Sequence, residues 1–319
     1  MEIALQFLLL VVGFVMLMKG ADWFVDGASK VADRFGIPHI VIGLTIVAFG
    51  TSAPEAAISI SAAVKGSVDL AISNVLGSNI MNVLLILGLA AIICPLAVKP
   101  SSIRFDIPFT FLVSGMLLAC GALGGQLTRT DGIIFWVLLI IDVIYMIRLT
   151  RKSQTEAGNT TQEEVQESGQ DKIWKSVLLI LVGAAMIIVG SDVTVDAATA
   201  IAYFFEMDER LIGLTIVAFG TSLPELVTSC MAAKKKETDI AVGNIVGSNL
   251  FNILFVLGTT AVITPIAYTS AFIVDNLVAI AVMLLLWLLV FRSKKLSRQS
   301  GILFLVLYAA YFANLIVNA

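Results

Sequence analysis

Two glutamates in the middle of apolar segments are the residues of this chain best suited to chemistry. Residues 43–55 read GLTIVAFGTSAPE and end at Glu55, and residues 213–225 read GLTIVAFGTSLPE and end at Glu225. A carboxylate inside an apolar segment is costly unless a cation, a proton or a polar cavity compensates its charge. No Lys or Arg lies at matching depth in the sequence to pair with either one. We therefore expect the two glutamates to form a site for cations or protons.

The residues before each glutamate predict a break in the helix that carries it. Pro54 has no N–H for the carbonyl of Gly50, and its ring crowds that carbonyl. Thr51 and Ser52 supply hydroxyls that could cap a second half-helix. The first half-helix would then end in free carbonyls, which suit a cation. The second copy repeats these types at Gly220, Thr221, Ser222 and Pro224.

A second polar stripe follows each glutamate. Asn74, Ser78 and Asn82 are spaced i, i+4, i+8 and share one helix face, and Asn244, Ser248 and Asn252 repeat them. We expect Asn74 and Asn244 to serve partly in hydrogen bonds between helices, which contribute ~0.6 kcal/mol on average in membranes. Asn79 and Asn249 lie off the stripe and are predicted to be structural.

The donors gathered by these motifs are all hard oxygens: carboxylates, hydroxyls, amide carbonyls and main-chain carbonyls. Such a set suits Ca²⁺, Na⁺ or Mg²⁺ and argues against Cu or Zn. The chain has only three Cys and one His, which leaves little scope for thiolate or imidazole sites. Ca²⁺ accepts ~6–8 oxygens in flexible geometry, whereas Mg²⁺ sheds water reluctantly, so a site built by protein favours Ca²⁺. Two carboxylates balance one Ca²⁺ or two monovalent cations.

Composition shows which elements must position these donors. The chain is 59% hydrophobic and 13% charged, whereas soluble domains are ~45–50% apolar and ~25% charged. We predict a multi-pass membrane protein, because a spanning helix needs ~20 apolar residues and ten such segments can be placed. They cover roughly residues 3–25, 40–64, 70–93, 107–126, 131–149, 174–197, 211–233, 240–263, 272–291 and 301–317. No cleavable signal peptide is expected at the N-terminus.

An internal repeat relates the two halves at a constant offset of 170 residues. It pairs the two glutamate motifs and continues without a gap through Gly13 and Gly183, Gly20 and Gly190, Asp22 and Asp192, Asp26 and Asp196, Asn82 and Asn252, and Gly88 and Gly258. Each half holds five predicted spans, and five is odd, so the second copy would enter the membrane from the opposite side. Inverted repeats with broken helices at their centre are typical of secondary transporters.

We therefore predict an all-α membrane protein with ten transmembrane helices, arranged as two inverted five-helix repeats with broken helices at the centre. Residues 1–150 would form the first repeat (motif 43–88), 151–172 a polar cytoplasmic linker, and 173–319 the second repeat (motif 213–258). Of the 20 Lys and Arg residues, 16 would lie in loops on one side and three on the other. Basic residues favour the cytoplasmic side, which places both termini outside a cell (plasma or inner) membrane.

The paired GTSxPE segments, each followed by Gly-Ser-Asn at 77–79 and 247–249, resemble the two α-repeats of the calcium/cation antiporter superfamily. The chain looks like a prokaryotic sodium/calcium exchanger over its whole length except the linker. The resemblance implies ion ligands at Thr51, Ser52, Glu55, Ser78, Asn82, Thr221, Ser222, Glu225, Ser248 and Asn252, and at the main-chain carbonyls of Ala48 and Ala218. It also implies that the first and sixth spans, which carry the repeated glycines, slide to alternate access.

One position departs from part of that family. Some members have Asp where this chain has Asn252, which argues against potassium dependence and leaves the coupling ion open. The resemblance implies Ca²⁺ and Na⁺ as transported partners within a lipid bilayer, without a prosthetic group, nucleic acid or obligatory protein partner. The nearest alternative is a proton-coupled Ca²⁺/Mn²⁺ exchanger with the same site. A channel would build its filter around an open axis, and a serine protease would need His or Lys beside its Ser, so both are disfavoured.

Overall fold

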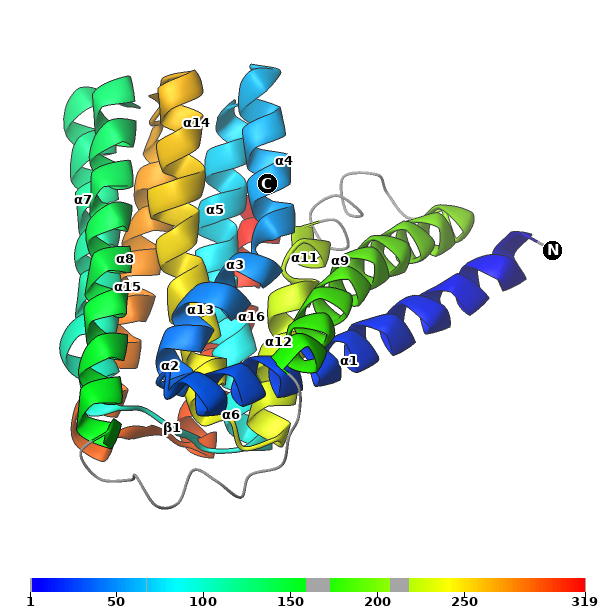
Figure 1. Ribbon diagram of the computed structural model, residues 1–319. Helices are drawn as coiled ribbons and strands as arrows, with labels where there is room; N and C mark the ends of the chain where they lie inside the picture. The colour runs from blue at the N-terminus through cyan, green and yellow to red at the C-terminus, as the bar shows by residue number, and fades with distance from the viewer. Residues whose placement is uncertain (1, 67, 159–172, 207–217, 319) are drawn as a thin grey trace.

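The computed structural model describes residues 2–66, 68–158, 173–206 and 218–318, and these are almost entirely helical (Figure 1). The first half contains α1 (Glu2–Phe35), α2 (His39–Ile42), η1 (Gly43–Val47), α3 (Ala48–Thr51), α4 (Ala53–Val64), α5 (Val68–Met81), η2 (Asn82–Leu87), α6 (Gly88–Ile93), η3 (Ser102–Asp106), α7 (Ile107–Gly124) and α8 (Arg129–Gly158). The second contains α9 (Ile173–Phe204), α11 (Ala218–Gly220), α12 (Leu223–Lys234), α13 (Thr238–Phe251), η5 (Asn252–Leu257), α14 (Gly258–Ile263), α15 (Ser270–Ser293) and α16 (Arg298–Asn318). The η segments are π-helical.

Helices able to cross a membrane are present among the described residues, although fewer than the ten predicted meet the criteria of length and hydropathy. The described residues contain seven helices that are long and apolar enough, and eight if the bent pair His39–Thr51 and Ala53–Val64 is one span. The predicted span 211–233 begins outside the described residues. Most of the predicted linker 151–172 also lies outside them. The chain is therefore a multi-pass membrane protein by the length and composition of its helices.

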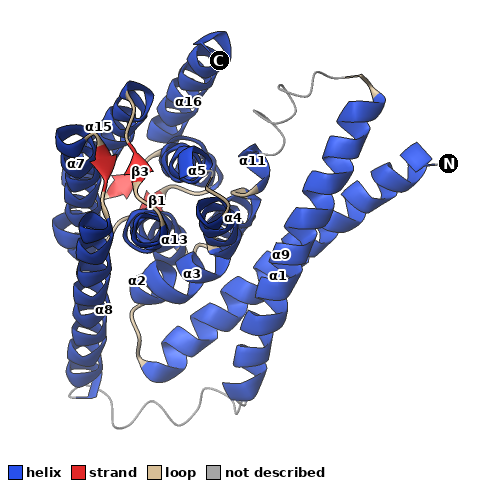
Figure 2. Cartoon of the chain, turned by 90° about the horizontal axis from the view of Figure 1, so that it is seen from above, coloured by secondary structure: helices blue, strands red, loops and turns tan. Residues whose placement is uncertain are grey.

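Two continuous helical rods form the centre of the molecule. In the rods Val68–Ile93 and Thr238–Ile263, 72% and 94% of the residues of an apolar 18-residue stretch are buried, against at most 33% in the other spanning helices. They run side by side with α4 in the bundle, while α7, α8 and α15 cover one side and α1 and α9 cross the other (Figures 1 and 2). The central rods carry the two polar stripes, so the fold places these stripes away from lipid.

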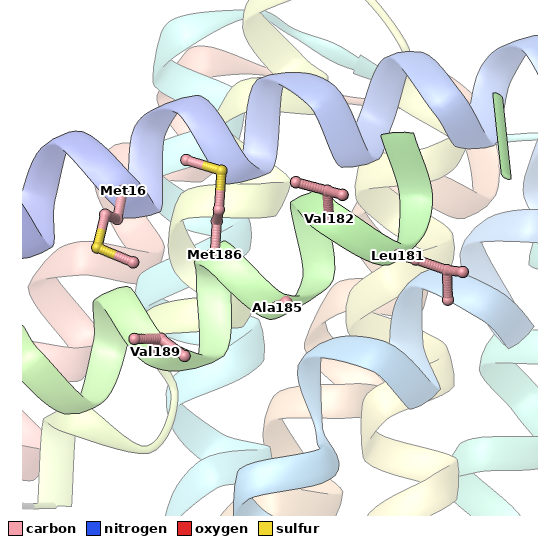
Figure 3. A pocket seen from close by; sticks show the side chains of 6 residues that line it. All are labelled: Met16, Leu181, Val182, Ala185, Met186 and Val189. Carbon is pink, nitrogen blue, oxygen red and sulfur yellow. The ribbon is translucent and has the colours of Figure 1, made fainter. Parts of the chain in front are cut away.

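The long helices α1 and α9 approach each other closely through glycines. Gly20 lies against Gly183, and Gly13 lies against Gly190 and Thr194. A Cβ atom added at Gly183 would lie 2.7 Å from the main-chain oxygen of Gly20. A shallow apolar pocket remains beside this contact, as Figure 3 shows, lined by Met16, Leu181, Val182, Ala185, Met186 and Val189. Glycine is therefore required sterically where the two helices touch.

We expect Gly183→Ala to destabilise the protein by ~1–3 kcal/mol, the usual cost of overpacking, because the added methyl meets main-chain atoms of α1 that cannot rotate away. Thermal unfolding in detergent measures this as a lower Tm. Gly115→Ala in α7 is the matched control, since a Cβ there meets nothing within 4 Å. An unchanged Tm for Gly183→Ala would mean that α1 and α9 are not packed this closely in the membrane.

Four two-residue strands correct the all-α prediction in detail. β1 (Leu96–Ala97) pairs antiparallel with β4 (Lys295–Leu296), and β2 (Gln126–Leu127) pairs antiparallel with β3 (Ile266–Ala267). Each pair joins one half of the chain to the other, at a place where a helix has just ended. Main-chain groups of such segments need hydrogen-bond partners, and a segment 139–200 residues away in the chain supplies them. No local sequence pattern identifies that segment.

Candidate functional site

The predicted helix break is present in the first half. His39–Thr51 and Ala53–Val64 meet at Ser52 with a bend of 51°, and Pro54 lies in the first turn of α4. In the second half, α11 ends at Gly220 and α12 begins at Leu223, again with a proline in its first turn. The broken helix is confirmed for the first half, while the second is described only from Ala218 onward.

The two serines at the breaks bind the glutamates rather than cap their own helices. Ser52 and Ser222 occupy the N-cap positions of α4 and α12, but neither side chain makes a cap hydrogen bond. Ser52 Oγ instead donates to Glu225 Oε1 at 2.7 Å, and Ser222 Oγ donates to Glu55 Oε1 at 3.2 Å. The capping prediction is therefore wrong. A hydrogen bond to an ionised acceptor is about twice as strong as a neutral one, so the carboxylate of the opposite half competes successfully for each hydroxyl.

The glutamates are fully enclosed. Glu55 is 1% exposed and Glu225 is 0% exposed, and their carboxylates interact electrostatically with each other. Each lies in the first turn of a half-helix, where the positive end of the helix dipole favours an anion. The Oε2 atom of each glutamate has no hydrogen-bond partner. Two buried carboxylates so close together need a cation or a proton for charge balance.

The two central rods supply neutral oxygens to the site. Ser78 Oγ lies 3.3 Å from Ser222 Oγ, which places it beside the Glu55 carboxylate. Ser248, Asn82 and Asn252 are each at most 1% exposed. Asn82 is the first residue of η2 and Asn252 is the first residue of η5, and π-helical turns are frequent at functional sites. The residues of the two predicted stripes are therefore buried, except for Asn74, which is partly buried.

Asn74 and Asn244 serve in bonds between helices, as predicted. Asn74 Nδ2 donates to Ser59 Oγ at 3.0 Å, and Asn244 Nδ2 donates to Ser229 Oγ at 2.9 Å. These two bonds are related by the same 170-residue offset as the motifs. The matched contacts show that equivalent residues of the two halves occupy equivalent surroundings here.

Five buried oxygens of this region have no hydrogen-bond partner: Glu55 Oε2, Glu225 Oε2, Asn82 Oδ1, Asn252 Oδ1 and Ser248 Oγ. Leaving such atoms unpaired is expensive, and it is unusual for five to come from one set of motifs. All five can coordinate a hard cation. Within the described ranges, no group of three or more His, Cys, Asp or Glu residues could hold a metal, so any cation here must rely on neutral oxygens beside the two carboxylates.

The remaining predicted ligands are less available in this structure. Thr51 is fully buried, and its hydroxyl lies 3.1 Å from the Val47 carbonyl and 3.0 Å from Asn244 Oδ1. The carbonyl of Ala48 accepts the Ser52 N–H at 2.9 Å and also lies 3.4 Å from the Thr51 hydroxyl. Thr221 lies in the break between α11 and α12, and Ala218 is the first residue of α11.

The comparisons with known proteins agree with one another. A sequence profile described as "Sodium/calcium exchanger protein" matches residues 5–148 and 175–317. The inner membrane protein YrbG of Escherichia coli is 40% identical over 92% of this chain and 92% of its own length. The sodium/calcium exchanger MaX1 of Methanosarcina acetivorans is 30% identical over 98% of this chain and 99% of its own length. A solved structure of the sodium-calcium exchanger NCX_Mj has a TM-score of 0.86 and 31% identity, covering 98% of this chain and 99% of that one.

Proposed function

This chain belongs to the sodium/calcium exchanger family, and we propose that it is a secondary antiporter that exchanges Ca²⁺ for Na⁺ across a cell membrane. The observation that carries this proposal is the group of five unpartnered, buried oxygens around Glu55 and Glu225. One Ca²⁺ or two Na⁺ would neutralise the two carboxylates. A site that either cation can fill, but not both together, is sufficient for exchange.

We assign the transported ions to the two helix breaks and the two central rods. The ligands would be Glu55, Glu225, Thr51, Ser52, Thr221, Ser222, Ser78, Asn82, Ser248 and Asn252, with the carbonyls of Ala48 and Ala218. Ser52 and Ser222 already lie on the carboxylates of the opposite half. An ion that enters would therefore contact both halves at once, which suits a site that must open to either side.

The proposed architecture has ten crossings in two inverted repeats, 1–150 and 173–319, with 151–172 as a cytoplasmic linker and both termini outside. The 16-to-3 distribution of basic residues and the matched hydrogen bonds of Asn74 and Asn244 support this arrangement. Reversal of the second repeat would present equivalent surfaces to opposite sides of the membrane.

Proton coupling is the second candidate. Asn82 and Asn252 are amides, so Glu55 and Glu225 are the only carboxylates of the proposed ligand set. A buried carboxylate can exchange a cation for a proton. The same site could then exchange Ca²⁺ or Mn²⁺ for H⁺.

Radioactive Ca²⁺ uptake into proteoliposomes tests both candidates. Purified protein would be reconstituted into two sets of vesicles. One set would be loaded with Na⁺, and the other would carry an outward proton gradient. Uptake driven only by the Na⁺ gradient supports the proposed exchange, and uptake driven only by protons supports the second candidate. Absence of Ca²⁺ uptake under both gradients would overturn Ca²⁺ antiport.

An ionic latch on α1 supports alternating access. Lys235, just after α12, lies 2.8 Å from Asp22 Oδ1 and 2.5 Å from Asp26 Oδ1. Burial opposes the charge of Lys235, but the bonds to the two carboxylates outweigh it and raise the pKa of the Lys235 ammonium. The residues 170 positions away are Lys65, Asp192 and Asp196. In the part of the chain that the structure describes, no ion pair joins Lys65 to these two aspartates.

We expect Lys235→Gln and Lys65→Gln to shift the access equilibrium in opposite directions. In our proposal the Lys235 latch closes the cytoplasmic side, and the Lys65 set forms after α1 and α9 slide. Loss of a partly exposed ion pair costs at most ~1 kcal/mol, which corresponds to about a fivefold change in the equilibrium constant between the two access states. Half-saturating Ca²⁺ measured in right-side-out and inside-out vesicles should fall on the cytoplasmic side for Lys235→Gln and on the outer side for Lys65→Gln. Equal shifts on both sides would contradict the latch.

A further inference from the structure

Two asparagines outside the proposed ligand set clamp the central rods together. Asn79 Nδ2 donates to the main-chain oxygen of Asn249 at 3.3 Å, and Asn249 Nδ2 donates to the main-chain oxygen of Asn79 at 3.2 Å. Both residues are at most 4% exposed. Because they occupy matched positions of the repeat, the two bonds are reciprocal and join the halves at the centre of the molecule.

The same two asparagines hold two of the proposed ligands. Asn82 Nδ2 donates to Asn249 Oδ1 at 2.9 Å, and Asn252 Nδ2 donates to Asn79 Oδ1 at 3.2 Å. Asn82 Oδ1 and Asn252 Oδ1 are buried and have no partner. The side-chain nitrogen of each clamp asparagine thus donates to a main-chain oxygen of the opposite half. Its side-chain oxygen accepts a hydrogen bond from the amide of a proposed ligand.

These contacts fix which end of each ligand amide remains available. If the Asn79 amide were rotated by half a turn, its oxygen would face the Asn249 carbonyl and its nitrogen would face Asn252 Nδ2. One contact would then place two acceptors together and the other two donors, so two buried hydrogen bonds would be lost. The clamp therefore accepts only a donor from residues 82 and 252, so the oxygens of these residues remain free.

We infer that Asn79 and Asn249 are positioning residues of the ion site, which present the carbonyl oxygens of Asn252 and Asn82 to the transported cation and require an amide at those positions. This inference rests on the proposed function and deepens it. An ionised carboxylate accepts hydrogen bonds but cannot donate them. At position 252 it would place an acceptor against Asn79 Oδ1. The clamp would accordingly limit the site to the two carboxylates of Glu55 and Glu225.

The first test is Ca²⁺ affinity in Asn79→Ala and Asn249→Ala. Loss of a residue that orients a metal ligand commonly costs ~10–100-fold in affinity, so we expect half-saturating Ca²⁺ to rise at least tenfold in both variants. Asn74→Ala is the matched control, because it removes an amide from the same rod whose bond goes to Ser59. We expect this control to remain within about twofold of the wild type. Tm is measured for all three variants, so that a general loss of stability is separated from a loss of affinity.

The second test asks whether the clamp determines the residue type at position 252. With Asn79 present, Asn252→Asp should give no gain in Ca²⁺ affinity, because the new carboxyl faces an acceptor. In the Asn79→Ala background that acceptor is gone, and the same substitution should lower half-saturating Ca²⁺ by about tenfold relative to Asn79→Ala alone. Equal effects of Asn252→Asp in the two backgrounds would overturn the inference.

The wild-type measurement separates this inference from the function on which it rests. Absence of Ca²⁺ uptake by the wild type would overturn Ca²⁺ antiport. Normal wild-type uptake with unchanged affinity in Asn79→Ala and Asn249→Ala would overturn only the positioning role. A rise in half-saturating Ca²⁺ that is equally large in Asn74→Ala would also overturn it, since the effect would then follow from any buried amide on the rod.

Discussion

Glu55→Gln and Glu225→Gln are each expected to reduce Ca²⁺ uptake at least 100-fold. Glutamine keeps the shape of the side chain and can still accept the serine hydroxyl, so the hydrogen bonds from Ser222 or Ser52 can persist. The charge is lost, and a single buried carboxylate would face a divalent cation. Removing one partner of a buried charge pair costs ~3–5 kcal/mol, which is at least a hundredfold.

The measurement is initial Ca²⁺ uptake into proteoliposomes at equal protein content. Asp106→Asn is the matched control, because Asp106 is also fully buried and the repeat places Asn276 at its equivalent position. We expect the control to retain uptake near the wild-type value. Uptake within tenfold of the wild type in either glutamine variant would place the Ca²⁺ site elsewhere.

Ser52→Ala and Ser222→Ala are expected to raise half-saturating Ca²⁺ by ~10–100-fold each. Each serine donates to the glutamate of the opposite half, and a hydrogen bond to a charged group contributes ~1.5–3 kcal/mol. Alanine removes this bond together with a proposed oxygen ligand. The two variants should behave alike, because the halves make equivalent contacts.

Ca²⁺ titrations of uptake provide the measurement, with Ser114→Ala as control. Ser114 is 3% exposed, and its hydroxyl bonds to the Thr110 carbonyl within α7, away from the breaks. A large effect in one serine variant and none in the other would show that the two halves contribute unequally. Equal and small effects in both would leave the serines as helix-break residues without a role in ion binding.

Much of the fold could be predicted because its signals are local. Apolar length marks a spanning helix whatever surrounds it. Pro54 interrupts its own helix regardless of tertiary contacts, because it has no N–H for the Gly50 carbonyl. The i, i+4, i+8 spacing correctly placed Ser78 and Asn82 on a buried face. The hydrogen-bond partners of the polar side chains were harder to predict. Ser52 could cap α4 or bind a distant carboxylate, and both choices fit the sequence equally well.

Asn79 shows the same limit within the candidate site. Its position off the polar stripe indicated a structural residue, and its main-chain bond to Asn249 agrees with that reading. Its acceptor, however, holds the amide of Asn252. The repetition of Gly-Ser-Asn in both halves was the available signal, but repetition alone does not indicate that the two copies touch.

The sequence by itself determined the membrane class, the repeat, the helix breaks and the hard-oxygen character of the buried donors, because hydropathy, proline geometry and the cost of a carboxylate in an apolar span act within a few turns of one helix. Only the tertiary structure decided the exchange of serine and glutamate between halves, the asparagine clamp, the paired short strands and the latch at Lys235. Nearly all of these contacts join residues more than 140 positions apart. Their partners are selected by how the two halves pack, and packing brings together groups that no local pattern relates.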